Sequence, residues 1–307
     1  MPSLARIDCP SELRAHSRGN LNSPTAMALA PEFVPTAFSL ATILLWGTSD
    51  FLGGFASRRA NAFLVTATVL LSGLLLMTTL VLISHPPFPS GKSILWALAA
   101  GTSGGSALAI FYRALAEGRM GLTAPVAALL GAAIPTAFGM MTEGVPRTIQ
   151  IAGFFLAGLG IWLISRTEDG SSAEGIWLAV LSGIGFAGFF LGMKEAGEGS
   201  AMWLSLFTRT GGLAVAATIV LSQGRLREIN LASGLYSVLA GCLDVTGTAL
   251  FVRASQTGRL DAAVVLTSLY PAVTVLLARI VLREHFTRWK AVGIFAAVLA
   301  VPLIAAQ

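Results

Sequence analysis

The sequence AIFYRALAEGR, residues 109–119, recurs 140 positions later as ALFVRASQTGR, residues 249–259. The two copies share the arginines Arg113 and Arg253 at one position, and arginine is not a generic residue of lipid-facing helices. The same shift matches a second set of residues near the end of each half: Gly153, Phe155, Ala157, Leu159, Leu163 and Ile164 with Gly293, Phe295, Ala297, Leu299, Leu303 and Ile304. We interpret the chain as an internal duplication.

Both copies lie in long apolar runs, and the chain has about ten of these. A helix needs about 20 apolar residues to cross a hydrocarbon core of about 30 Å, whereas barrel strands are far shorter. The chain is 55% hydrophobic and 11% charged, against about 25% charged in a typical soluble domain. We therefore predict an all-α integral membrane protein with spans at Pro35–Phe55, Ala62–Ser84, Ile94–Glu117, Met120–Thr142, Ile149–Ser165, Glu174–Lys194, Ser200–Ser222, Ser233–Gln256, Leu260–Leu282 and Arg288–Ala306.

The most polar connection, residues 166–173, separates the two halves of the duplication. We predict a first five-helix repeat over residues 35–166 and a second over residues 167–307. Five spans is an odd number, so the second half enters the membrane from the opposite face. About ten transmembrane helices then form two inverted five-helix repeats, an architecture that many secondary transporters share.

Residues 1–34 form a polar tail that lacks the apolar core of a secretory signal peptide. We expect this tail to be disordered. It has no evident structural role before Met27, which is therefore an alternative start of the chain.

Two motifs connect the chain to a known family. The first span contains LWGTSDF, residues 45–51, and the ninth contains SLYP, residues 268–271, followed by REHFT, residues 283–287. This pattern resembles the drug/metabolite transporter superfamily, specifically the ten-helix proteins with two EamA domains. The resemblance implies transport of small metabolites, amino acids, sugars or drugs. It marks the fold well and the substrate poorly.

Two charged residues lie deep inside consecutive spans, Arg209 in the seventh and Asp244 in the eighth. At 1.5 Å per residue they are about 20 Å and about 17 Å from the same membrane face. Their similar depth permits a salt bridge, and charges at such depth face a cavity or a partner. The pair is either a substrate or proton site or a structural ion pair, and the sequence leaves both open.

Asp50 follows Trp46 by one helical turn, so the two side chains share a face of the first span. One interpretation is an acidic residue that lines a vestibule and binds a cation or a proton, with Trp46 as an aromatic wall. The other is a carboxylate at a helix end that pairs with Arg113 or Arg279.

Prolines occupy corresponding spans of the two halves, Pro135 in the fourth and Pro271 in the ninth. Proline frees a backbone carbonyl and kinks a helix, and paired kinks can mark a central cavity. Tyr270 would then supply a hydroxyl there. Proline is also tolerated in membrane helices for packing alone. The first half departs from the family pattern here, because Leu130-Gly131 stands in place of the Tyr-Pro step.

Small residues recur every four positions in the third span, at Ala97, Gly101, Gly105 and Ala109. Such stripes allow close contact between membrane helices. We predict that they pack helices together and do not contact substrate.

Several classes of function lack the residues that they need. The histidines, His16, His85 and His285, lie outside the spans, and two cysteines cannot form a metal cluster. No basic patch with interleaved aromatics suggests nucleic acid, and no Gly-rich segment ends in a P-loop. We predict no cofactor and no enzymatic activity.

The leading hypothesis is a secondary active transporter of a small organic molecule that works by alternating access. Proton coupling through Asp50 or Asp244 is part of this hypothesis. The alternatives from other classes are a membrane-embedded enzyme and a receptor without transport.

We expect a multi-pass protein of the plasma (inner) membrane, surrounded by lipid. The orientation stays open, because two rules disagree. The loops on the side opposite the termini carry more Lys and Arg, which places that side in the cytoplasm by the positive-inside rule. The family resemblance implies cytoplasmic termini, and we adopt that arrangement.

Overall fold

The computed structural model of the protein describes residues 33–117, 120–142, 144–165, 173–223, 231–283 and 287–305. This part of the chain forms a bundle of helices. Their bounds are α1 Phe33–Ser57, α2 Ala62–Ser84, α3 Gly91–Glu117, α4 Met120–Thr142, α5 Thr148–Ser165, α6 Ala173–Ala196, α7 Ala201–Gln223, α8 Leu231–Thr257, α9 Leu260–Thr267, α10 Tyr270–Leu282 and α11 Arg288–Ala305.

These helices confirm the predicted spans to within a few residues, and α9 and α10 together make up the ninth. Seven helical segments of the described chain are long and apolar enough to cross a membrane, and α5 contains a shorter apolar helix. Although α1 is 25 residues long, it is not among the seven. Its polar residues, including the buried Thr42, Ser49 and Asp50, face the protein interior.

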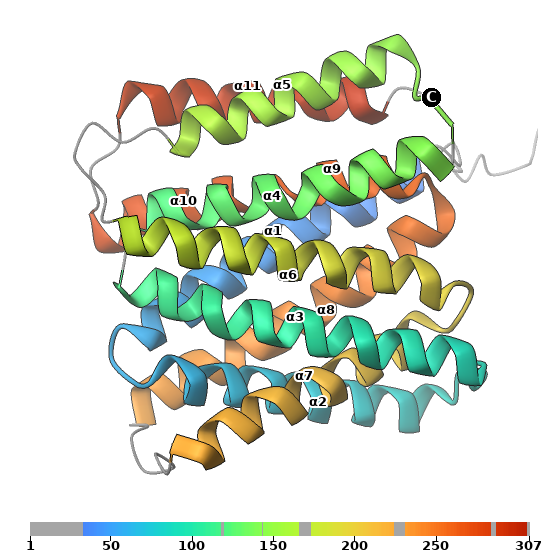
Figure 1. Ribbon diagram of the computed structural model, residues 1–307, viewed down its shortest axis with the longest axis vertical. Helices are drawn as coiled ribbons and strands as arrows, with labels where there is room; N and C mark the ends of the chain where they lie inside the picture. Colours follow the sequence, from blue (N-terminus) through green and yellow to red (C-terminus); the bar gives the residue numbers. More distant parts are fainter. Residues whose placement is uncertain are drawn as a thin grey trace, which may run out of the picture.

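The helices run side by side in two layers (Figure 1). The layer nearer the viewer contains α3, α4 and α6, and the layer behind it contains α1, α8, α9 and α10. The pair α5 and α11 covers one edge of the two layers, and the pair α2 and α7 covers the opposite edge.

The contacts between helices keep their pattern when the two halves of the chain are exchanged. In the predicted duplication α1 corresponds to α6 and α3 corresponds to α8. The most extensive contacts join α3 to α6 and α1 to α8, which are equivalent pairs. The corresponding helices α5 and α11 also pack against each other, as do α2 and α7.

The direction of these packed helices shows that the repeat is inverted. The amide of Gln150, near the start of α5, donates to the carbonyl of Ile304, at the end of α11, at 3.3 Å. The two helices therefore run antiparallel. Two equivalent neighbours that run antiparallel are related by an axis perpendicular to them, which lies in the membrane plane. The predicted pair of inverted repeats is confirmed.

Glycines bring the helices into contact at equivalent places in the two halves. A Cβ atom on Gly101 of α3 would lie 2.2 Å from the carbonyl oxygen of Thr208 on α7. The residue 140 positions later is Gly241 of α8, where a Cβ atom would lie 2.1 Å from the carbonyl oxygen of Val69 on α2. The predicted role of the small residues in packing is confirmed.

The two prolines lie differently within their spans. Pro135 lies within α4, which continues as a helix from residue 120 to 142. The ninth span is interrupted instead: α9 ends at Thr267, and α10 begins at Tyr270 with Pro271 in its first turn. Proline is tolerated there because the first backbone N–H groups of a helix have no intrahelical acceptor. The break lies directly before Pro271, where the sequence predicts a kink, and the kinks at Pro135 and Pro271 stay predictions.

Some predictions concern residues outside the described part of the chain. The first 32 residues of the predicted tail belong to this group, and so does Cys9. The connection between the halves lies outside as well, from residue 166 to 172. Of the predicted tail, Phe33 and Val34 already belong to α1.

Candidate functional site

A cavity of about 60 Å³ lies between the two layers, about halfway along the helices. Its lining combines aromatic rings, small residues and three charged side chains. These residues are Trp46, Asp50, Gly104, Leu108, Ala127, Ala128, Gly131, Phe186, Phe189, Phe190, Arg209, Asp244, Thr248, Ser268 and Tyr270. All five residues predicted for substrate binding or coupling, Trp46, Asp50, Arg209, Asp244 and Tyr270, lie in this one lining.

The lining repeats the register of the duplication. Five pairs of its members are 140 positions apart: Trp46 with Phe186, Asp50 with Phe190, Gly104 with Asp244, Leu108 with Thr248, and Ala128 with Ser268. Equivalent residues of the two halves therefore line the same cavity. The cavity lies on the pseudo-twofold axis that relates the halves.

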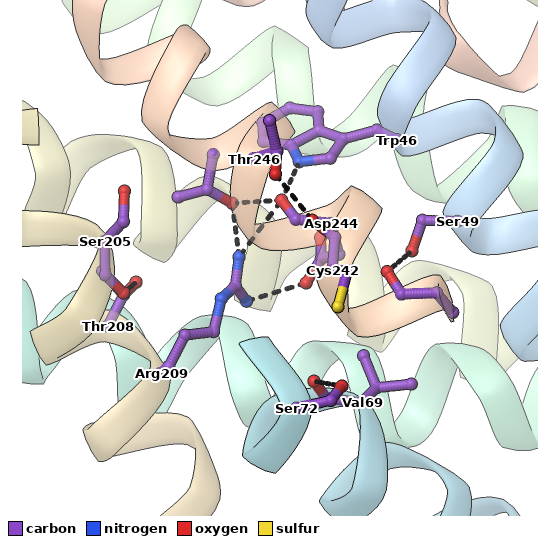
Figure 2. A network of polar contacts seen from close by, with 12 residues as sticks. Trp46, Ser49, Val69, Ser72, Ser205, Thr208, Arg209, Cys242, Asp244 and Thr246 are labelled. Carbon is purple, nitrogen blue, oxygen red and sulfur yellow. Dashed lines mark hydrogen bonds and ion pairs between the residues drawn. The ribbon is translucent and has the colours of Figure 1, made fainter. Parts of the chain in front are cut away.

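Arg209 and Asp244 form the ion pair that their depth permits. The distance between Arg209 Nη1 and Asp244 Oδ2 is 2.8 Å, and the exposed fractions of the two side chains are 8% and 14%. Arg209 Nη2 also donates to the hydroxyl of Thr248 and to the backbone carbonyl of Asp244. Figure 2 shows the guanidinium reaching from α7 to α8. Most of its donors are therefore already engaged within the protein.

Three side chains on one face of α1 fasten this helix to α8. Thr42, Trp46 and Ser49 donate to the backbone carbonyls of Gly247, Asp244 and Ala240, at 3.2, 3.1 and 2.8 Å. In Figure 2 the indole of Trp46 and the guanidinium of Arg209 approach the Asp244 segment from opposite directions. These bonds fix Trp46 at the wall of the cavity.

Gly47 lets α1 approach α10. A Cβ atom on Gly47 would lie 2.6 Å from the carbonyl oxygen of Tyr270, and the hydroxyl of Thr274 donates to the carbonyl of Gly47 at 3.0 Å. This contact places the ring of Tyr270 edge-on to Trp46, with 6.2 Å between the ring centroids.

Trp46 is the centre of an aromatic cluster. Besides Tyr270, its ring has centroid distances of 5.6 Å to Phe251, 6.0 Å to Phe190 and 6.4 Å to Phe189. Rings at these separations contribute about 0.5–1.5 kcal/mol per pair beyond their area burial. The cluster therefore joins the two halves of the chain by aromatic packing beside the cavity.

Asp50 lies one turn beyond Trp46 on α1 and also lines the cavity. The residue is only 7% exposed, and its carboxylate makes no ion pair or hydrogen bond with any residue of the described chain. Arg113, a partner considered from the sequence, is paired with Glu117 instead, with 2.9 Å between Nε and Oε1. A buried carboxylate without a cation is costly at this depth, so Asp50 is suited to accept a proton or a cation.

The two prolines and the single described cysteine lie apart from this chemistry. Pro135 and Pro271 are not among the lining residues, although Tyr270 is. Cys242 is a free thiol. Within the described ranges, no three His, Cys, Asp or Glu side chains come together as a metal site.

The sequence interpretation missed several lining residues. Phe186 and Phe190 follow from the 140-residue register when it is applied to Trp46 and Asp50. Thr248 follows from its place one turn after Asp244 on the same helix face. Phe189 has no comparable signal, because one more phenylalanine in an apolar span is unremarkable by sequence.

Residues 173–306 match the EamA-like transporter family. The resemblance predicted from the motifs is confirmed over this second, EamA-like half, and it indicates a membrane transporter of small molecules, which argues against an enzyme. A sequence search of curated proteins finds no match. Several solved structures match, and one of them, a crystal structure, has a TM-score of 0.71 and 16% sequence identity. The match covers 89% of this chain and 98% of the other and shows a shared fold.

Proposed function

We propose that the protein is a secondary active transporter that carries a small organic molecule across the membrane by alternating access. The observation that supports this most is the cavity on the pseudo-twofold axis, lined by five residue pairs 140 positions apart. When two inverted repeats exchange conformations, a site on their common axis opens first to one side and then to the other.

The small size of the cavity fits a stage of the transport cycle in which the binding site is narrow. Its volume is about 60 Å³, whereas binding pockets for drug-sized molecules have about 300–1,000 Å³. The site must therefore widen to admit a substrate. Movement of the two layers relative to each other would provide this space.

The energy for transport comes from a gradient in this proposal. Gly91-Lys92-Ser93 is the first turn of α3, and Pro86 stands where a P-loop has its first glycine, so this segment does not bind ATP in that way. Asp50 would carry the coupling proton. The charged and titratable groups that lie around it are Asp244 of α8, Arg209 of α7, Tyr112 of α3 and Tyr270 of α10.

Reconstitution in proteoliposomes tests the proposal. A panel of labelled amines, amino acids, sugars and carboxylates is assayed for uptake with and without an imposed proton gradient. We expect saturable uptake of one class, faster with the gradient, and loss of the gradient effect in Asp50→Asn. Glu117→Gln, a carboxylate outside the cavity, serves as the control and keeps wild-type uptake. Wild-type uptake in Asp50→Asn at every gradient would refute the coupling role.

The location in the plasma (inner) membrane and the cytoplasmic placement of the termini belong to the same proposal. Single cysteines placed at Arg58 and at Arg147 report the two sides, after Cys9 and Cys242 are replaced by serine. The proposed orientation predicts labelling of the Arg58 position by an impermeant reagent from outside the cell. Labelling of the Arg147 position instead would show the opposite orientation in the membrane.

A further inference from the structure

We propose that the central cavity selects organic cations, specifically a substituted ammonium or guanidinium group attached to an apolar body. This inference rests on the proposed transport function and adds the class of substrate. It is argued from the charge of the lining, the arrangement of the rings around it, and the occupancy of Arg209.

The charge of the cavity favours a cation. Three charged side chains line it, Asp50, Asp244 and Arg209. Arg209 and Asp244 neutralise each other at 2.8 Å. When Asp50 is deprotonated, it leaves the lining one negative charge in excess. A charge inside the membrane requires a partner, and a positively charged substrate provides one.

The rings lie where a substituted ammonium group would bind beside Asp50. Trp46 precedes Asp50 by one turn, and Phe190, the counterpart of Asp50 in the other half, packs against Trp46 at 6.0 Å. Tyr270 meets Trp46 edge-on from α10. Aromatic faces attract cations by about 0.5–2 kcal/mol each, with tryptophan the strongest. A carboxylate next to several rings therefore suits a cation with apolar substituents.

An anion finds no free cation in the same lining, because both terminal nitrogens of Arg209 are engaged and, within the described chain, only its buried Nε–H has no acceptor. Arg209 is the cationic side chain among the described lining residues, and it is engaged by Asp244 and Thr248. An anionic or zwitterionic substrate would have to displace Asp244 from Arg209 and leave a second carboxylate unpaired. Removing one partner from a buried ion pair is strongly unfavourable.

Equilibrium binding to the full chain in lipid nanodiscs tests this inference. The probe is labelled benzyltrimethylammonium, which is charged at every pH. It is compared with its neutral carbon analogue neopentylbenzene, with benzylsulfonate and with phenylalanine. We expect saturable binding of the cation and at least tenfold weaker binding of the other three.

Two kinds of variant locate the binding. Asp50→Asn is expected to weaken cation binding at least tenfold, and Trp46→Leu at least threefold. Asp50→Glu keeps the charge and is expected to retain binding, which covers the case in which Asp50→Asn fails to fold. Glu117→Gln is the matched control outside the cavity and is expected to bind like the wild type.

The outcomes separate this inference from the proposed function. Equal or tighter binding of the neutral analogue, the sulfonate or phenylalanine overturns the cation class, and so does the absence of saturable cation binding to folded protein. Transport of a neutral or anionic substrate in proteoliposomes overturns the cation class and leaves the transporter proposal intact. Selective cation binding without transport of any compound supports the cation site and overturns the transporter proposal.

Discussion

The two walls of the cavity have the same architecture and opposite chemistry. The wall formed by α3, α4 and α6 contributes Gly104, Leu108, Ala128 and Phe190. At the equivalent positions, the wall formed by α8, the α9–α10 joint and α1 carries Asp244, Thr248, Ser268 and Asp50. One wall is therefore apolar and the other polar.

This difference shows that the two repeats share their helix packing but not the side chains that line the cavity. The backbone contacts are shared: Gly101 on α3 and Gly241 on α8 make equivalent close contacts with α7 and α2. The side chains that face the cavity are not shared. The shared inverted scaffold would allow the two halves to exchange conformations. The side chains that differ between the two walls would determine which substrate is selected.

The largest expected effect comes from a change that breaks the shared scaffold. Gly101→Leu should abolish folding, because its Cβ atom would lie 2.2 Å from the Thr208 carbonyl oxygen and force α3 away from α7. Its counterpart Gly241→Leu should do the same. The yield of monodisperse protein after detergent extraction, followed by size-exclusion chromatography, measures this. Gly158→Leu is the control, because no atom lies within 4 Å of a Cβ there. A normal yield of Gly101→Leu would show that the contact between α3 and α7 can adapt to the larger side chain.

The next effect concerns the polar wall alone. Arg209→Gln or Asp244→Asn leaves its partner unpaired, and breaking a buried ion pair costs about 3–5 kcal/mol. We expect each single variant to melt at lower temperature and to lose transport. The double variant Arg209→Gln/Asp244→Asn should regain much of the melting temperature without regaining transport. A double variant that transports at the wild-type rate would make the pair purely structural.

A smaller effect compares equivalent rings in the two walls. Trp46→Leu should lower kcat/KM about tenfold, equivalent to about 1.4 kcal/mol, because Trp46 packs against four other rings and donates to α8. Phe186→Leu, 140 positions later, should lower it less than threefold. Initial rates of uptake in proteoliposomes provide the comparison. Equal losses in the two variants would mean that the walls contribute alike.

The smallest effect tests a single hydroxyl of the polar wall. Thr248→Val removes one acceptor of Arg209 and keeps the shape of the side chain. We expect a reduction of kcat/KM of about threefold, because Arg209 retains its contact with Asp244. Leu108→Val at the equivalent position of the apolar wall should change the rate less. A larger loss in Leu108→Val would contradict the assignment of the walls.

Much of the fold could be read from the sequence, because lipid imposes a simple rule. A helix must be apolar for about 20 residues to cross the membrane, so its length and place appear directly in the chain. The matches of Arg113 with Arg253 and of Gly153 with Gly293 fixed the register of the duplication. In the ninth span the sequence predicts a kink at Pro271, and the structure has a break between α9 and α10 directly before this proline.

The candidate site was harder to predict, because it depends on which helix faces meet. By sequence Asp50 lies near the end of its span, yet it lines the same cavity as Asp244. A charged residue inside an apolar span is costly in lipid, so the sequence alone singles out Asp50, Arg209 and Asp244 as candidates. Apolar lining residues such as Phe189 carry no such cost and become visible only when the helices are packed.

The break between α9 and α10 has a consequence for the resting state of the molecule. Its counterpart α4 is a continuous helix, so the joint at Ser268 and Leu269 exists in one half only. Exchanging the conformations of the halves would require α4, which contains Pro125 and Pro135, to open a break that its continuous helix does not have here. The inward-open and outward-open states of the transporter should therefore differ in free energy. Without substrate, most molecules should occupy one of these two states.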